Sequence, residues 1–82
     1  MFDYDPELLE ALSALGIVPR PHTTPEQAKE AATDLYRYEL RRLRDSLLRR
    51  EIPKAGYSDR VVQLRRRYWM LSVPLQQWAR KR

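Results

Sequence analysis

Residues 24–53 read TPEQAKEAATDLYRYELRRLRDSLLRREIP and form the longest segment of the chain with a continuous helical pattern. Thr24 is a residue type favoured at helix N-caps, a proline occupies the first helical position, and Gln27 completes a capping box of the form T-x-x-Q. Neither proline nor glycine then interrupts the chain until Pro53. The pattern therefore predicts one long α-helix over residues 25–51.

One face of this helix is apolar along its length. The apolar residues recur at spacings of three and four, which places them on one side of an α-helix. They are Ala28, Ala32, Leu35, Tyr36, Leu40, Leu43 and Leu47. At 1.5 Å per residue the helix is about 40 Å long, whereas a compact domain of this size is about 30 Å across. We therefore expect the helix to overhang the rest of the domain.

A first, shorter helix is predicted over residues 6–15. Asp5 is its N-cap, and a proline follows at the first helical position. Gly16 ends it, and Ile17 is expected to fold back onto the last turn in a Schellman motif.

Two further helices are predicted after the long one, over residues 59–71 and 74–80. Ser58 is the expected N-cap of the former, whose apolar stripe consists of Val61, Leu64, Tyr68 and Leu71. The latter begins near Pro74 and ends in the basic residues Arg80, Lys81 and Arg82, which favour a helix C-terminus.

Together these elements predict an all-α fold for residues 1–82. We expect a small single-domain helical bundle of three long helices plus a short C-terminal helix, in which the long central helix forms an αα-hairpin with the third. A chain of 82 residues supports one core. Because there is no cysteine, neither a disulfide nor a thiolate metal site supplements that core.

The charge is distributed unevenly along the chain. Residues 1–34 contain seven acidic residues against two basic ones, and residues 35–82 contain fourteen basic residues against four acidic ones. Such asymmetry indicates either an anionic partner for the basic half, or pairing of the two halves within a chain or head to tail between chains.

Arginines form the main candidate site for a partner or for phosphate. Arg37, Arg41 and Arg44 recur on one face of the long helix, and Arg65, Arg66 and Arg67 follow on the next helix. The competing interpretation is a solvated face, partly neutralised by helical neighbours such as Asp34 with Arg37 and Arg41 with Asp45. The preference for arginine over lysine also fits a GC-rich coding sequence.

A second apolar edge indicates self-association or docking on another protein. Val62, Trp69 and Met70 lie outside the main stripe of their helix, and Trp78 follows near the C-terminus. A small core has little room for so much apolar surface. A homodimer is the simplest symmetric arrangement that would cover it.

A DNA-binding helix-turn-helix over residues 51–67 is a weaker alternative. Gly56 is suitable as the turn residue, and Ser58 as the cap of a recognition helix. However, Pro53 falls where the first helix should continue, and Arg65 falls where the second helix should bury an aliphatic residue.

Catalytic and cofactor chemistry is not indicated. The single histidine, His22, has neither cysteine nor a second histidine to share a metal with, and two glycines cannot form a phosphate-binding loop. We expect no enzyme activity, no cofactor, no metal and no small-molecule substrate. The first residues lack the features of a secretory signal, and no apolar run is long enough to cross a membrane, so we expect a cytoplasmic protein without integral membrane association.

The sequence therefore predicts a non-enzymatic protein-protein interaction module. We expect an accessory or adaptor subunit that self-associates, most simply as a dimer, and holds an acidic partner on its arginines. The alternative is a nucleic-acid-binding regulator that uses the same arginines on phosphates.

Overall fold

In the computed structural model, which describes residues 1–82, three α-helices make up most of the chain. They are α1 (Pro6–Ala14), α2 (Pro25–Leu48) and α3 (Lys54–Arg67). Two short 3₁₀ turns follow α3, at Trp69–Ser72 and Leu75–Gln77. Two short strands, β1 (Phe2–Tyr4) and β2 (Ala79–Lys81), complete the fold.

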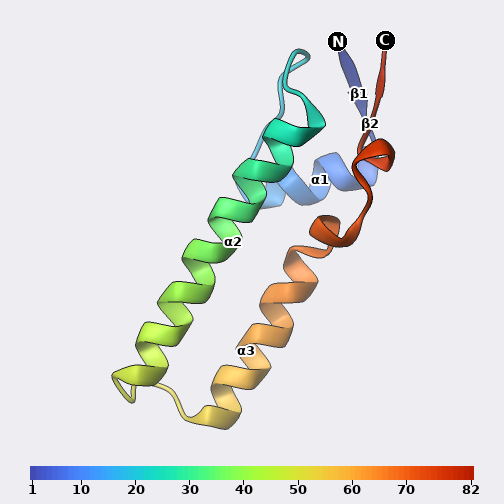
Figure 1. Ribbon diagram of the computed structural model, residues 1–82. Coiled ribbons are helices and arrows are strands. Elements are labelled where there is room, and N and C mark those ends of the chain that lie inside the picture. Colours follow the sequence, from blue (N-terminus) through green and yellow to red (C-terminus); the bar gives the residue numbers. More distant parts are fainter.

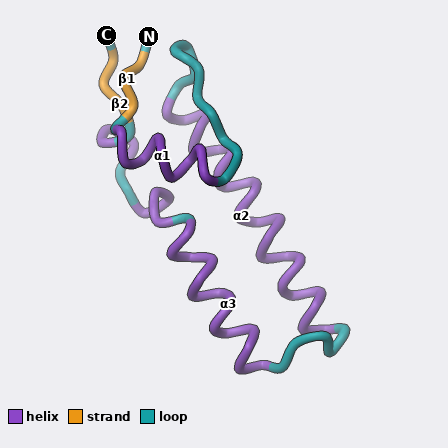
Figure 2. The backbone as a smooth tube through the Cα atoms, turned by 180° about the vertical axis from the view of Figure 1, so that it is seen from behind, coloured by secondary structure: helices purple, strands orange, loops and turns teal.

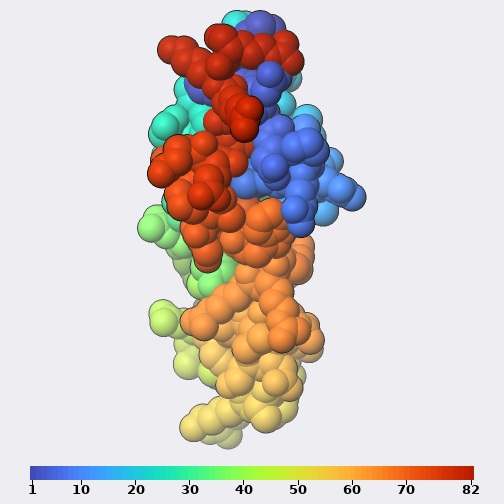
Figure 3. All heavy atoms as spheres, turned by 90° about the vertical axis from the view of Figure 1, so that its right-hand side faces the viewer, coloured from blue at the N-terminus to red at the C-terminus, as the bar shows by residue number.

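The helices α2 and α3 lie side by side and run in opposite directions (Figures 1 and 2). A short loop joins them at one end of the molecule, and α1 crosses them near the other end. The molecule measures 49 × 18 × 16 Å, so the long hairpin extends well beyond the part covered by α1. Figure 3 shows this elongated shape, with the two chain termini gathered at one end and the hairpin loop at the other.

Three helix ends lie where the sequence predicts them: the start and the end of α1 and the start of α2. The Leu8 amide donates to Asp5 Oδ2 over 3.0 Å, so Asp5 caps α1. The Thr24 and Gln27 side chains accept from each other's backbone amides over 3.1 and 2.9 Å, which completes the capping box of α2. Gly16 adopts a φ of 83°, and the Ile17 amide donates to the Leu12 carbonyl over 2.9 Å, as the Schellman motif requires.

The helix α2 ends at Leu48, three residues before the predicted end. Arg50 adopts a left-handed φ of 60°, and the Glu51 amide donates to the Ser46 carbonyl over 2.9 Å. This is a second Schellman motif, with arginine at the position where glycine is usual. This helix end could not be predicted from the sequence, because Arg50, the residue that ends the helix, is a good helix former.

Replacing Arg50 with glycine is expected to stabilise the protein by about 0.5–1 kcal/mol, because glycine adopts a positive φ without steric strain. Urea denaturation measures the change. Arg49 adopts a φ of −82°, so Arg49→Gly is the matched control and should give no gain. Equal effects of the two substitutions would contradict this explanation of the helix end.

The helix α3 begins at Lys54, five residues before the predicted start. Pro53 occupies the N-cap position and the Tyr57 amide donates to its carbonyl over 2.9 Å, so Ser58 lies inside the helix instead of capping it. Gly56 is also helical, so the turn of the helix-turn-helix alternative is absent. That alternative is wrong, because α2 and α3 form an antiparallel hairpin.

The predicted helix over residues 74–80 is wrong. Only Leu75–Gln77 forms a 3₁₀ turn, and β2 then pairs antiparallel with β1, with Asp3 opposite Arg80. The Arg82 amide donates to the Met1 carbonyl over 2.9 Å, and the Arg82 guanidinium forms an ion pair with Asp3. The local sequence pattern favours a helix here. The chain instead forms a strand, because it pairs with β1, which lies at the other end of the sequence.

The Asp3–Arg82 contact makes stability sensitive to acid. The hydrogen bond from Arg82 lowers the pKa of Asp3, so the folded state favours the carboxylate more than the unfolded state does. The stabilisation is present above the unfolded pKa and is lost as pH falls through the folded pKa. Between about pH 5 and pH 3, the wild type should lose more stability than Asp3→Asn, as measured by urea midpoints. Parallel curves for the two proteins would contradict this.

The hydrophobic core lies at the end of the molecule where α1 crosses the hairpin. The eight buried apolar residues come from all three helices and from the turns after α3; they are Leu8, Leu12, Ala28, Ala32, Leu64, Tyr68, Met70 and Trp78. Most residues of the apolar faces predicted for α2 and α3 belong to this core or pack against it; the exceptions are Leu47 and Val61, which are half-buried. No helix is long and apolar enough to span a bilayer.

Candidate partner-binding surface

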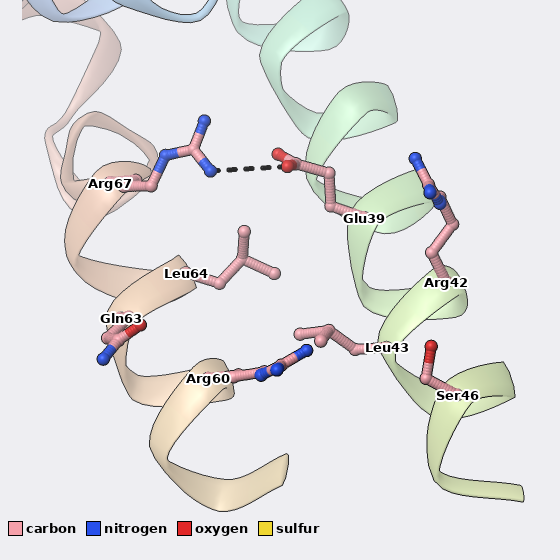
Figure 4. Close-up of a pocket in the computed structure, with 8 residues that line it drawn as sticks. All are labelled: Glu39, Arg42, Leu43, Ser46, Arg60, Gln63, Leu64 and Arg67. Atoms are coloured by element: carbon pink, nitrogen blue, oxygen red, sulfur yellow. Dashed lines mark hydrogen bonds and ion pairs between the residues drawn. The ribbon is translucent and has the colours of Figure 1, made fainter. Parts of the chain in front are cut away.

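Two grooves run along the hairpin, one on each side of the α2–α3 contact. We call the first the arginine groove; it is lined by Arg37, Leu40, Arg41, Arg44 and Tyr57 and has a volume of about 280 Å³. The second, the Glu39 groove, has a volume of about 320 Å³ (Figure 4). Its lining residues are Glu39, Arg42, Leu43, Ser46, Arg60, Gln63, Leu64 and Arg67.

The arginine groove is basic and has no carboxylate in its lining. Arg37, Arg41 and Arg44 are exposed, and the three ion pairs of the structure involve none of them. Leu40 and Tyr57 give the groove an apolar component. Guanidinium groups of this kind suit bidentate binding of carboxylate or phosphate.

The Glu39 groove contains its own counter-charge. Arg67 reaches from α3 toward α2 and lies 3.5 Å from Glu39, as Figure 4 shows. The Arg42 guanidinium lies 5.9 Å from the centre of the exposed Tyr38 ring, within reach of a cation–π contact. Part of the positive charge of this groove is therefore already engaged within the chain.

Glu39 also ties the hairpin together at the edge of the core. The hydroxyl of buried Tyr68 donates to the Glu39 carboxylate, and the rings of Tyr68 and Tyr36 lie 5.1 Å apart. Burial and the contact with Glu39 raise the pKa of Tyr68 well above its ordinary value, so its hydroxyl stays protonated. Glu39 thus has a structural role, because its carboxylate accepts from Arg67 at the end of α3 and from Tyr68, the next residue.

The six arginines of the predicted site do not share one surface. Arg37, Arg41 and Arg44 share the arginine groove, whereas Arg67 lies across the hairpin in the Glu39 groove. Arg65 and Arg66 are exposed on α3 and line neither groove. The helical neighbours Asp34 with Arg37 and Arg41 with Asp45 form no ion pair; the ion pairs are Arg49–Glu51, Arg67–Glu39 and Arg82–Asp3.

Of the four apolar residues predicted to form an interface, two are exposed and two are buried. Val62 and Trp69 are 47% and 37% exposed, so they remain accessible on α3 and just after it. Met70 and Trp78 are both 0% exposed, and their assignment to an interface is wrong. The turns after α3 fold both side chains back into the core, and Trp78 Nε1 donates to the Val73 carbonyl over 3.0 Å.

Sequence reasoning missed three contributors to these surfaces. Tyr57, in the first turn of α3, lines the arginine groove. Arg42 and Arg60 line the Glu39 groove, and finding them requires the register between α2 and α3. No three side chains of histidine, aspartate, glutamate or cysteine gather in a group that could hold a metal ion.

Comparison with known proteins gives no match: no family model, no curated protein and no solved structure is significantly similar to this chain.

Proposed function

We propose that this protein is a non-enzymatic interaction module whose arginine groove binds an acidic protein partner. The observation that carries the proposal is the contrast between the two grooves: Arg37, Arg41 and Arg44 form no ion pair and line a groove without a carboxylate, whereas Arg67 is already paired with Glu39. A basic groove that also contains Leu40 and Tyr57 favours a partner that offers both carboxylates and apolar side chains.

The charge of the hairpin supports the same proposal. Residues 35–67 contain eleven basic and four acidic residues, so the part of the molecule farthest from α1 is strongly positive. Val62 and Trp69 add exposed apolar surface to α3 and its end. Charge of this kind steers an acidic partner, and apolar contacts then prolong the complex.

A nucleic-acid-binding function is the second candidate, favoured by arginines on both sides of the hairpin. Phosphates bind such a surface through counterion release, so the affinity falls by orders of magnitude between about 50 and 200 mM salt. A protein partner that also uses Leu40 and Tyr57 should lose less affinity over the same interval.

The two candidates are separated by measuring binding to two defined ligands. One is a helical peptide with glutamates at spacings of four and three beside leucines, and the other is duplex DNA. Fluorescence anisotropy at about 50 and 200 mM salt should show peptide binding that persists at the higher salt. Tighter binding to DNA than to the peptide at the higher salt would replace the protein-binding proposal with the nucleic-acid one.

A further inference from the structure

Along one exposed stripe of α2, three acidic residues are followed by three arginines. Successive members are three or four positions apart, so at about 100° per residue all six lie within about 80° around the helix axis. In chain order they are Glu26, Glu30, Asp34, Arg37, Arg41 and Arg44. All six are exposed, and none forms an ion pair within the chain. We call this set the charge stripe.

The charge stripe is complementary to itself when a second α2 runs in the opposite direction. In such a pair, a twofold axis lies level with the bond between residues 35 and 36. Each residue of one copy then lies opposite the residue of the other copy for which the two residue numbers add up to about 71. Glu30 of one copy then faces Arg41 of the other, and Asp34 faces Arg37. Glu26 lies opposite a position next to Arg44. The symmetry repeats each pairing, whereas a parallel arrangement would oppose like charges.

We propose that a second copy of this chain is the acidic partner of the arginine groove, and that the two copies pair antiparallel through their charge stripes. The proposal rests on the proposed function, because it assigns an occupant to the same arginines. It explains why Arg37, Arg41 and Arg44 lack acidic partners in the single chain.

The fold leaves room for this contact. Ala28 and Ala32 face the core on the approximately opposite side of α2, so α1 does not cover the stripe. The stripe extends for about 27 Å, and helices packed 8–10 Å apart, roughly the usual spacing, are bridged by arginine and glutamate side chains. Leu48, which is 72% exposed, lies one turn beyond Arg44 on the same side and adds apolar surface.

The expected dimer is weak and sensitive to salt. Exposed ion pairs contribute little individually, and a contact along one pair of helices is smaller than the roughly 1,200–2,000 Å² of a standard interface. We expect dissociation constants in the micromolar to millimolar range, rising with ionic strength.

Sedimentation equilibrium on the full chain tests the proposal at about 50 mM salt, with protein concentrations up to about 1 mM. The triple variants Glu26→Arg/Glu30→Arg/Asp34→Arg and Arg37→Glu/Arg41→Glu/Arg44→Glu should each weaken the dimer by about a hundredfold or more, because every pair becomes repulsive. The variant that combines all six changes keeps the net charge of +5 and exchanges the two signs. It should form the dimer again, and circular dichroism checks that each variant is folded.

Two results would overturn the proposal. One is a wild type that stays monomeric under these conditions; the other is a dimer that either triple variant leaves intact. Both are distinct from failure of the proposed function, because the acidic peptide can still bind the arginine groove of a monomer. Loss of peptide binding as well would reject the proposed function itself.

Discussion

Replacing Trp78 with alanine is expected to lower the free energy of unfolding by about 3–5 kcal/mol. The side chain is completely buried, it is the largest member of an eight-residue core, and its indole nitrogen donates to the Val73 carbonyl. A small core has few other contacts to compensate for the cavity. Urea or thermal unfolding followed by circular dichroism measures the loss.

Trp69→Ala is the matched control for that experiment. Trp69 is 37% exposed and lies outside the core, so its removal should cost much less. If Trp78→Ala does not fold, Trp78→Phe preserves most of the burial and should still lose more stability than Trp69→Ala. Equal losses for the two tryptophans would contradict the placement of Trp78.

Replacing Glu39 with alanine is expected to lower the free energy of unfolding by about 1–3 kcal/mol. The substitution leaves the hydroxyl of buried Tyr68 without an acceptor between the two long helices. The accompanying loss of the Arg67 contact contributes little, because that arginine is largely exposed. Chemical denaturation measures the change.

Two further variants separate the causes. Glu39→Gln keeps an acceptor for Tyr68 and should cost less than Glu39→Ala. Adding Tyr68→Phe to Glu39→Ala removes the unpaired hydroxyl and should recover part of the loss. A double variant whose cost equals the sum of the two single costs would show that the Tyr68–Glu39 hydrogen bond is not the cause.

The sequence was sufficient at three helix ends that are determined locally. Asp5, Thr24 with Gln27, and Gly16 each act through atoms within five residues, and each produces the helix end that it predicts. The spacing of the apolar residues likewise identified the inward faces of α2 and α3. Such signals need no knowledge of the rest of the fold.

The sequence was insufficient where the partner is distant. The pairing of β1 with β2 joins residues at the two ends of the chain, and it converts a predicted helix into a strand. The same fold-back buries Met70 and Trp78, which were predicted to lie at an interface. In the candidate site, the spacing of Arg37, Arg41 and Arg44 was visible, but the separation of Arg67 depends on hairpin register.

The most direct test of the arginine groove compares two triple variants with the same change in net charge. One is Arg37→Gln/Arg41→Gln/Arg44→Gln, in the groove. The other is Arg42→Gln/Arg60→Gln/Arg66→Gln, whose arginines are also exposed and also form no ion pair but lie elsewhere on the hairpin. The dissociation constant of the acidic helical peptide is measured for each at about 50 mM salt. We expect a loss of affinity of about tenfold or more for the first variant and of less than about threefold for the second. Equal losses would mean that the peptide senses only overall charge, and would contradict a site in the arginine groove.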